Sequence, residues 1–249
     1  MGKKPQPPIE ELFQESYRQL LHIAMALFII PLRWFGFWYA IEIAIFAFFW
    51  NLLVMPRWFK GSFRPLEIQK GYSTGMLVYP ISIIIMAVLF PLPIMAAGWA
   101  VLSVSDGCAT LFGKLFGKRH LPWNKNKTWV GSFSFWASAA IFGWVALVWT
   151  GNSIEFSSNV SWRFLGLLDS ATFSLNVNYP IYYLMKDFLN DAPLVCGCSC
   201  IAGLGAAIVE SLPFPKIDDN LFIPIIYCLL CIFIILYLSL FTLINVVGP

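Results

Sequence analysis

Charged residues are scarce in this chain of 249 residues. They make up 12% of it, whereas soluble domains usually carry about 25%. Hydrophobic residues make up 59% and aromatic residues 17%. The shortage of charge excludes an ordinary soluble domain, and one membrane domain accounts for the whole length. The composition therefore predicts an all-α polytopic membrane protein.

Excess positive charge and metal-binding patterns are also lacking. The net charge of +3 is too small to argue for nucleic acid, and no basic stripe is interleaved with exposed aromatic residues. Nucleic acid is therefore excluded as a partner. The six cysteines make no disulfide framework. Cys196, Cys198 and Cys200 alternate, but no histidine or fourth cysteine is near them. Tight helix packing is therefore favoured over a soft-metal site.

Runs of about 20 apolar residues predict about seven transmembrane helices. The expected spans are roughly 19–33, 35–55, 72–91, 93–112, 129–150, 193–211 and 221–246. Residues 1–18 are a polar N-terminal segment on the cytoplasmic side, and residues 19–249 form a single transmembrane catalytic domain. Within it, the apolar runs of 152–192 are too short to span, so this segment is expected to be an external excursion with interfacial helices.

The distribution of lysine and arginine predicts which loops face the cytoplasm. If the N-terminus is inside and the spans alternate, 13 of the 16 lysine and arginine residues fall inside. Such a split is what the positive-inside rule expects. The loop 113–128 alone carries five of these residues. We therefore expect this loop to face the cytoplasm, where nucleotides are found.

Acidic residues are expected at the same face. Asp106 and Glu210 lie at the cytoplasmic ends of predicted spans, and Asp218, Asp219 and Asn220 follow Glu210. An ionisable residue at membrane depth is a functional hypothesis. Acids can hold a divalent metal, glycines let a phosphate approach the backbone, and lysines neutralise phosphate charge. The combination predicts a nucleotide site at the membrane surface.

Four motifs occur in the chain in a recognisable order. They are ESYRQLLH (15–22), GYSTGMLVYP (71–80), DGCATLFGKLFGK (106–118) with NKTWVGS (126–132), and ESLPFPKIDDNLFIP (210–224). With these motifs the chain resembles the CTP-dependent membrane lipid-alcohol kinases: dolichol kinase, phytol kinase and CTP-dependent diacylglycerol kinase. This family is related to the CDP-diacylglycerol synthase superfamily, which shares the third motif. The fourth motif points to the kinases.

The resemblance implies transfer of phosphate from CTP, or from ATP, to a lipid alcohol, with Mg²⁺ as cofactor. Asp106, Glu210 and Asp219 are the expected catalytic acids, with Asp106 and Asp219 holding the metal. Either Glu210 or Asp219 completes the metal shell while the other accepts the proton of the lipid hydroxyl, and the sequence does not decide which. A helix cap or a structural role is the alternative for Asp106.

The remaining site residues are expected to bind the nucleotide or its phosphates. They are Arg18, Gly107, Gly113, Gly117, Lys125, Lys127, Thr128, Gly131, Ser132 and Asn220. Two alternatives stay open: helix packing of the G-x-x-x-G type for Gly113 and Gly117, and a solvated basic loop that holds lipid headgroups for the lysines. His22 is expected either to touch the lipid substrate or to make a hydrogen bond between helices.

Two other functions remain possible for this pattern. A cytidylyltransferase would use the same metal and lysines but would keep CMP on the lipid and release pyrophosphate. A non-enzymatic lipid transporter would need a polar path through the membrane, and no inverted repeat with broken helices is visible. The sequence does not distinguish a polyprenol, phytol or diacylglycerol as the acceptor.

Overall fold

The computed structural model describes residues 9–59, 63, 65–153, 181–213 and 218–246. Every regular element in this part of the chain is a helix, which confirms the all-α fold class. The elements are α1 (Ile9–Ala24), η1 (Met25–Ile29), α2 (Leu32–Phe49), η2 (Trp50–Val54), α3 (Met55–Trp58), α4 (Pro65–Lys70), α5 (Thr74–Leu89), α6 (Leu92–Ala100), η4 (Val101–Ser105), α7 (Asp106–Phe116), α8 (Trp129–Gly151), α11 (Ile181–Asn190), α12 (Ala192–Ser211) and α13 (Asp219–Val246).

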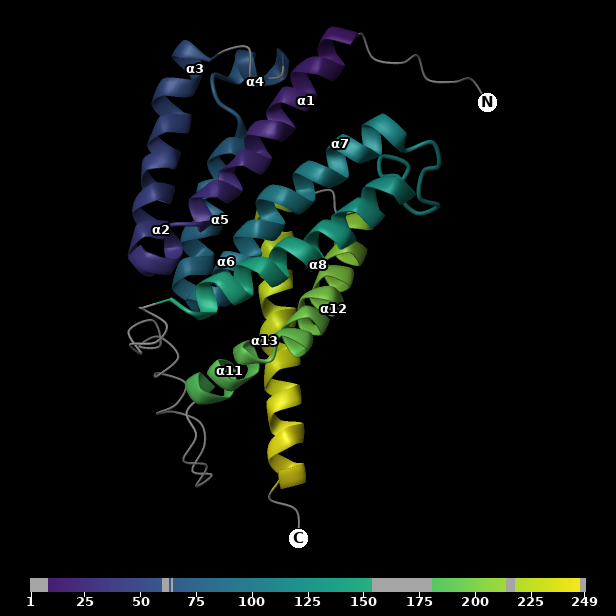
Figure 1. The fold of residues 1–249 in the computed structure, drawn as a ribbon. Helices are drawn as coiled ribbons and strands as arrows, with labels where there is room; N and C mark the ends of the chain where they lie inside the picture. Colours follow the sequence, from purple (N-terminus) through teal and green to yellow (C-terminus); the bar gives the residue numbers. More distant parts are fainter. Residues whose placement is uncertain (1–8, 60–62, 64, 154–180, 214–217, 247–249) are drawn as a thin grey trace.

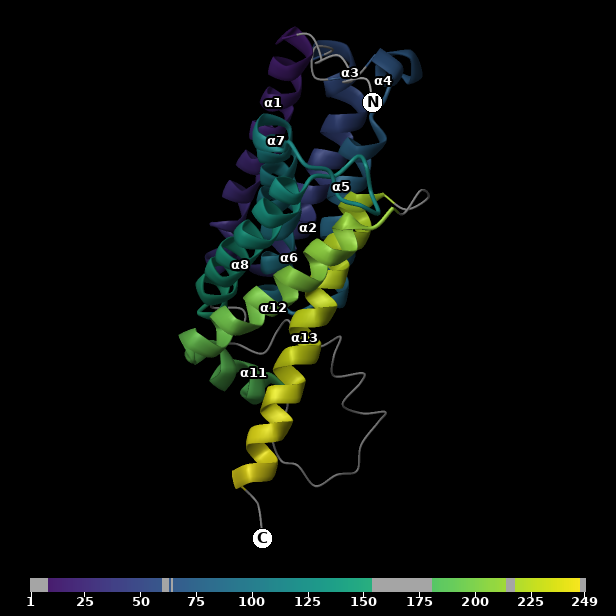
Figure 2. The ribbon, with the colours of Figure 1, turned by 90° about the vertical axis from the view of Figure 1, so that its right-hand side faces the viewer.

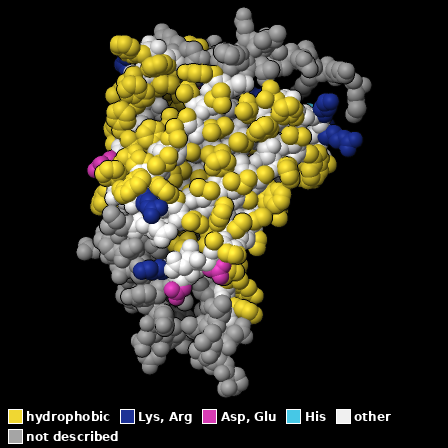
Figure 3. Space-filling model, in the orientation of Figure 1, with side chains coloured by type: hydrophobic (Ala, Val, Ile, Leu, Met, Phe, Trp, Pro, Cys, Tyr) yellow, Lys and Arg dark blue, Asp and Glu magenta, His cyan; other side chains and the backbone are white. Residues whose placement is uncertain are grey.

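Five continuous helices in the described residues are long and apolar enough to cross a membrane. They are Leu32–Trp58, Leu92–Phe116, Trp129–Gly151, Ala192–Ser211 and Asp219–Leu238. Helix α5 is apolar but shorter, so the predicted count of seven spans is not confirmed. Hydrophobic side chains cover most of the described surface in Figure 3. Long apolar helices with an apolar exterior are typical of a membrane protein.

The predicted first span, 19–33, is not a single helix. Helix α1 begins at Ile9, so the expected boundary at residue 18 falls inside it. This helix is amphipathic, and it passes into η1 before the chain turns at Pro31 into α2. Proline has no N–H to continue a helical hydrogen-bond pattern, which explains the break. A positive φ of 68° at Gly36 then kinks the first turns of α2.

The connections between helices lie at two opposite ends of the bundle. The end of α3, the start of α5, the loop between α7 and α8, the end of α12 and the start of α13 share one end (Figures 1 and 2). The turn from α1 to α2, the turn from α5 to α6, and α11 lie at the other. Amphipathic α11 belongs to the predicted excursion 152–192, of which residues 154–180 lie outside the described part. The basic loop and the acidic motif therefore share one end of the molecule, as predicted.

Helix α6 is at the centre of the bundle, and all nine of its residues are buried. It packs against α5, α8 and α13. The indole N–H of Trp99 donates to the hydroxyl of Tyr79 at 2.9 Å, so α6 is also tied to α5 by a buried hydrogen bond. Because α6 continues through η4 into α7, this buried helix fixes the position of Asp106.

The two ends of the bundle give a topology test. We expect Lys118→Cys and Asn190→Cys to react with an impermeant thiol reagent from opposite sides of the membrane. The background would carry serine at Cys108, Cys196 and Cys200, the native cysteines that are not buried. The positive-inside rule predicts that Lys118 faces the cytoplasm. Labelling of both positions from one side would contradict this topology.

Close packing of α8 gives a stability test. A Cβ atom at Gly143 would lie 2.1 Å from the Tyr227 hydroxyl and 2.7 Å from Ser199 Oγ, two groups that already hydrogen-bond at 2.7 Å. We expect Gly143→Val to cost about 1–3 kcal/mol and to lower the Tm in detergent. Gly197→Ala is the control, since nothing lies within 4 Å of a Cβ there. An equal Tm for both variants would refute the packing.

Candidate active site

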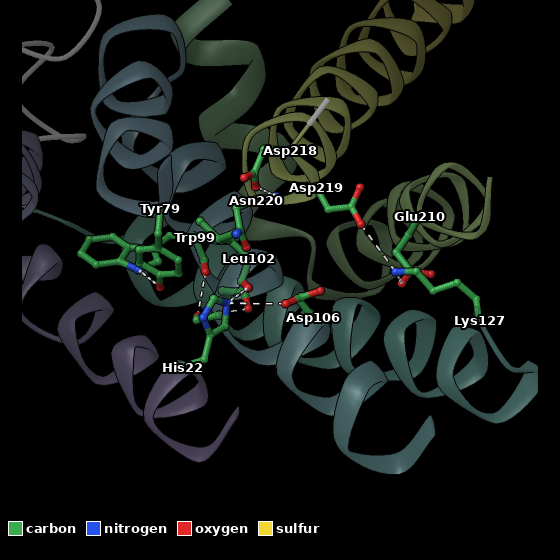
Figure 4. A network of polar contacts seen from close by, with 12 residues as sticks. His22, Tyr79, Trp99, Leu102, Asp106, Lys127, Glu210, Asp218, Asp219 and Asn220 are labelled. Carbon is green, nitrogen blue, oxygen red and sulfur yellow. Dashed lines mark hydrogen bonds and ion pairs between the residues drawn. The ribbon is translucent and has the colours of Figure 1, made fainter. Parts of the chain in front are cut away.

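A cavity of about 900 Å³ lies among α1, α2, α5, α7 and the start of α13. Charged and polar residues from separate segments meet on its wall. They include Arg18, Asp106, Lys114, Lys127, Asp219 and Asn220. Figure 4 shows several of these side chains pointing toward one another from different helices. Five of the six, all but Lys114, are site residues that the sequence predicted.

Asp106 is positioned by a break in the regular hydrogen bonding of its helix. The five residues of η4 before it form a π-helix, and the Asp106 N–H donates to the Val101 carbonyl, five residues back. In an α-helix this N–H would reach the Leu102 carbonyl instead. Single π-turns inside α-helices are frequent at functional sites. The irregularity leaves the Leu102 carbonyl available to a partner from another helix.

His22 of α1 is that partner. Its Nε2 donates to the Leu102 carbonyl at 2.9 Å and lies 3.8 Å from Asp106 Oδ2. The imidazole also makes a T-shaped contact with the Tyr79 ring, with the centroids 4.9 Å apart. The structure thus gives His22 the interhelical hydrogen bond that was one of its two expected roles. Because His22 also lines the cavity, a lipid contact stays a prediction.

Lys127 lies between carboxylates from two other helices. Its ammonium group pairs with Glu210 Oε1 at the end of α12 and lies 3.6 Å from Asp219 Oδ2 at the start of α13. Burial disfavours the charged form, but the negative charges of Glu210, Asp106 and Asp219 outweigh it and raise the pKa of Lys127. The amine therefore stays protonated at neutral pH and can attract a phosphate.

The two remaining acids differ in their surroundings. Glu210 is 4% exposed and is not among the residues that line the cavity. One of its oxygens pairs with Lys127, and the other has no hydrogen-bond partner among the described residues. The Asp219 side chain is 51% exposed and lies on the cavity wall. Glu210 is therefore suited to fixing the position of Lys127, and Asp219 is suited to binding a ligand in the cavity.

Glycines of the third motif lie where α7 crosses α8. A Cβ at Gly117 would meet Thr128 Oγ1 at 2.4 Å, and one at Gly131 would meet the Ala109 carbonyl at 3.0 Å and the Gly113 Cα at 3.5 Å. Thr128 Oγ1 accepts from the Gly131 N–H and caps α8. These contacts account for the glycines by close helix packing, one of the two expected roles. Phosphate contacts at these residues stay predictions.

Three other predicted residues lie away from the cavity wall. A Cβ at Gly107 would meet the Ile23 side chain at 2.5 Å, so this glycine lets α1 approach α7. Ser132 Oγ is buried without a hydrogen-bond partner among the described residues. Lys125 is exposed and does not line the cavity. The structure therefore separates Lys125 from Lys127, although both were expected to bind phosphate, with Lys127 the stronger of the two.

Arg18 is held by an acid that the sequence analysis missed. Its guanidinium lies 3.6 Å from Glu67 Oε2 of α4, and the Ser73 hydroxyl donates to Glu67 Oε1 at 2.8 Å. These contacts bring α1, α4 and the start of α5 together at the cavity. No local pattern marks Glu67, because its partners lie in other helices.

The N-terminus of α5 also lies on the cavity wall. Thr74, Gly75 and Met76 line the cavity, and no side chain caps this helix end. The Asn220 side chain faces it, 3.2 Å from where a Cβ of Gly75 would be. The first N–H groups of a helix have no partner within the helix and attract anions. The second motif, GYSTGMLVYP, was noticed in the sequence, but none of its residues was assigned a role.

Lys114 is a further cavity residue that was not assigned a role. It lies eight residues after Asp106, and Thr110 lies midway, so the three share one face of α7. All three line the cavity. The i, i+4, i+8 spacing is the signal that could have found Lys114.

The acidic residues of the cavity are too few to bind a metal ion alone, but they could bind one that also contacts a phosphate ligand. No group of three or more histidine, cysteine or acidic residues in the described part of the chain could hold a metal ion. Asp106 and Asp219 both line the cavity. Mg²⁺ is usually bound by one or two carboxylates plus substrate phosphates and water. The residues therefore fit Mg²⁺ bound with a polyphosphate, and the cofactor stays a prediction.

Comparison with known proteins finds kinases of lipid alcohols. The chain is 24% identical over 163 residues to a probable phytol kinase 1 of Oryza sativa subsp. japonica, covering 65% of this chain and 41% of that protein. It is 27% identical over 168 residues to phytol kinase 1 of Arabidopsis thaliana, covering 65% and 42%. It is 26% identical over 223 residues to farnesol kinase of the same plant, covering 84% and 62%.

These relatives confirm, at the level of the family, the resemblance that the four motifs predicted. The chain spans about two fifths of the length of the phytol kinases that it matches. No family model matches the chain, and no solved structure matches it.

The charge pairing of Lys127 gives a third prediction. Lys127→Met should lower the Tm, because it leaves the buried Glu210 carboxylate without its cation. Breaking a buried pair costs about 3–5 kcal/mol, an upper limit for this partly exposed lysine. Adding Glu210→Gln should restore most of the loss by removing the uncompensated charge. Lys125→Met, on the same loop, should leave the Tm unchanged. A double variant no more stable than Lys127→Met would disprove the pairing.

Proposed function

We propose that this chain is an integral membrane kinase that transfers the terminal phosphate of a nucleoside triphosphate to the hydroxyl of a lipid alcohol. One observation carries the proposal: a single cavity joins a wall of lysines and acids to a wall of apolar side chains. A nucleotide needs the first and a lipid the second. The relatives named phytol kinase and farnesol kinase support an isoprenoid alcohol as the acceptor.

The donor is proposed to be CTP, bound from the cytoplasm. This choice rests on the resemblance to CTP-dependent kinases, and the cytoplasmic side rests on the charge distribution along the chain. No contact in the cavity identifies the base. ATP is therefore the competing donor.

The triphosphate is proposed to lie between the start of α5 and the lysines. The uncapped N–H groups of Thr74 and Gly75 would donate hydrogen bonds to phosphate oxygens. Lys127 and Lys114, which also line the cavity, would neutralise phosphate charge. Arg18, fixed by Glu67, is the third cation on the wall. Phosphoryl transfer depends mainly on such positioning and charge neutralisation.

Mg²⁺ would be held by Asp106 and Asp219 together with phosphate oxygens. When bound, the ion would neutralise charge that develops on the transferred phosphoryl group. Glu210 would fix Lys127, its ion-pair partner, rather than accept a proton, because Glu210 does not line the cavity. The acceptor of the hydroxyl proton would then be one of the three aspartates on the wall, Asp106, Asp218 or Asp219.

The reaction would proceed by in-line displacement. The oxygen of the lipid hydroxyl forms a bond to the terminal phosphorus, and the bond from this phosphorus to the bridging oxygen of the nucleotide breaks. The hydroxyl proton passes to an aspartate, and the nucleoside diphosphate leaves with the electron pair. The products are a lipid monophosphate and CDP.

Product analysis tests the function. Purified protein in detergent would be supplied with Mg²⁺, labelled CTP or ATP, and phytol, farnesol or diacylglycerol. We expect a lipid monophosphate and the nucleoside diphosphate. A CMP-linked lipid together with pyrophosphate would instead make the protein a cytidylyltransferase, and no lipid product with any acceptor would refute an enzyme of either kind.

Asp106→Asn separates chemistry from folding. The change keeps the shape of the side chain but removes the charge that would hold the metal. We expect a rate loss of a hundredfold or more, on the order of 3 kcal/mol of transition-state stabilisation. Lys118→Ala, on the exposed part of the basic loop, should keep near-normal activity. Near-normal activity of Asp106→Asn at matched levels of monodisperse protein would refute the assignment.

A further inference from the structure

The cavity becomes apolar along α1. Arg18 lies on its wall near the charged residues, His22 follows one turn later, and Met25 and Phe28 of η1 continue the wall beyond His22. Ten residues of helix separate Arg18 from Phe28, about 15 Å at 1.5 Å per residue. The cavity is therefore elongated, and its lining changes from polar to apolar along its length.

Helices α2 and α5 show the same change of polarity along the same cavity. On α5 the lining residues pass from Thr74 through Tyr79 to Ile83. The α2 helix runs in the opposite direction, and its lining residues pass from Asn51 of η2 back to Ile43. The side-chain amide of Asn51 donates to the Met76 carbonyl at 2.7 Å, so polar ends of the two helices are joined. Three helices thus define one polar end and one apolar end.

The apolar end opens toward the outside of the bundle. Phe46 of α2 is 60% exposed and Phe28 of η1 is 38% exposed, although both line the cavity. Helix α1 packs against α7 and η4, whereas α2 packs against α5. The apolar wall therefore reaches the surface between η1 and α2. In a membrane protein this apolar surface faces lipid.

We propose that the hydrocarbon chain of the lipid alcohol enters from the bilayer between η1 and α2, and that Ala44 and Ala47 determine which chains fit. This inference rests on the proposed function for the identity of the ligand. The hydroxyl lies at the level of His22 and Asp106, where the wall changes from polar to apolar. The hydrocarbon chain of the lipid extends from there along η1, α2 and α5.

The apolar end of the cavity, here called the chain compartment, has to select among lipid chains by its shape. The hydrocarbon chain of the lipid moves from one apolar environment, the bilayer, to another, so its transfer gains little free energy from the hydrophobic effect. Ala44 is fully buried and Ala47 half-buried, and both are small lining residues on α2. A larger side chain at either position would occupy space that the hydrocarbon chain of the lipid needs.

Kinetics with alcohols of increasing length test the compartment. We compare geraniol, farnesol and phytol as acceptors for the unaltered protein, Ala47→Phe and Ala44→Leu. The kcat/KM for phytol relative to geraniol should fall about tenfold or more in each variant. Ile45→Phe is the matched control, because Ile45 is exposed on α2 and does not line the cavity. The same length preference in all four proteins would overturn the inference.

Photolabelling tests binding without relying on turnover. A farnesol analogue that carries a diazirine at the far end of its chain should label η1 and the cavity side of α2. Excess phytol should suppress this labelling, and Ala47→Phe should reduce it. Labelling confined to outward residues such as Ile45, or unaffected by phytol, would overturn the inference.

The two measurements also separate this inference from the proposed function. Labelling of η1 and α2 that phytol suppresses, without phosphorylation of any alcohol, would refute the kinase and support the chain compartment. Phosphorylation with labelling elsewhere would support the kinase and overturn the compartment.

Discussion

The ion pair between Lys127 and Glu210 is the interaction on which the charged wall of the cavity depends. It joins residues 83 positions apart, one in the loop before α8 and one at the end of α12. A carboxylate as buried as Glu210 is costly unless a cation compensates it. Lys127 also lies near Asp219, so the same ammonium group connects the start of α13 to the loop. Without this lysine, Glu210 at the end of α12 and Asp219 at the start of α13 would lose the cation that they share.

Irregular helical turns shape the rest of the site. Two π-helical segments, η2 and η4, interrupt long apolar helices. Trp50 and Asn51 of η2 line the cavity, and η4 directly precedes Asp106. Such turns shift side chains around the helix axis and leave a carbonyl available, as the hydrogen bond from His22 to Leu102 shows. The buried α6 leads directly into η4 and so fixes where that irregular turn lies.

The sequence predicted the charged half of the site better than the apolar half. Asp106, Lys127 and Asp219 stand in motifs whose residue types are tied to phosphate chemistry, and the structure brings them to one cavity. Glu67 and the start of α5 were missed, because their roles depend on contacts between helices distant in the chain. The glycines were ambiguous for a different reason: both phosphate binding and helix packing need the absence of a side chain. Counting apolar runs predicted spans at 19–33 and 35–55. The first is wrong as a single span, because α1 begins in the polar N-terminal residues and the chain turns at Pro31 into α2.

The charges on the cavity wall bear on the proposed cofactor. Its positive residues are Arg18, Lys114 and Lys127, and its negative residues are Glu67, Asp106, Asp218 and Asp219. The wall therefore carries no excess of positive charge with which to receive a triphosphate. Bringing such an anion close to carboxylates in a partly buried site is unfavourable unless a cation lies between them. A divalent ion that arrives with the nucleotide removes this repulsion and turns the aspartates into ligands. The acids that would repel a nucleotide alone are thus the groups that would favour it as a magnesium complex.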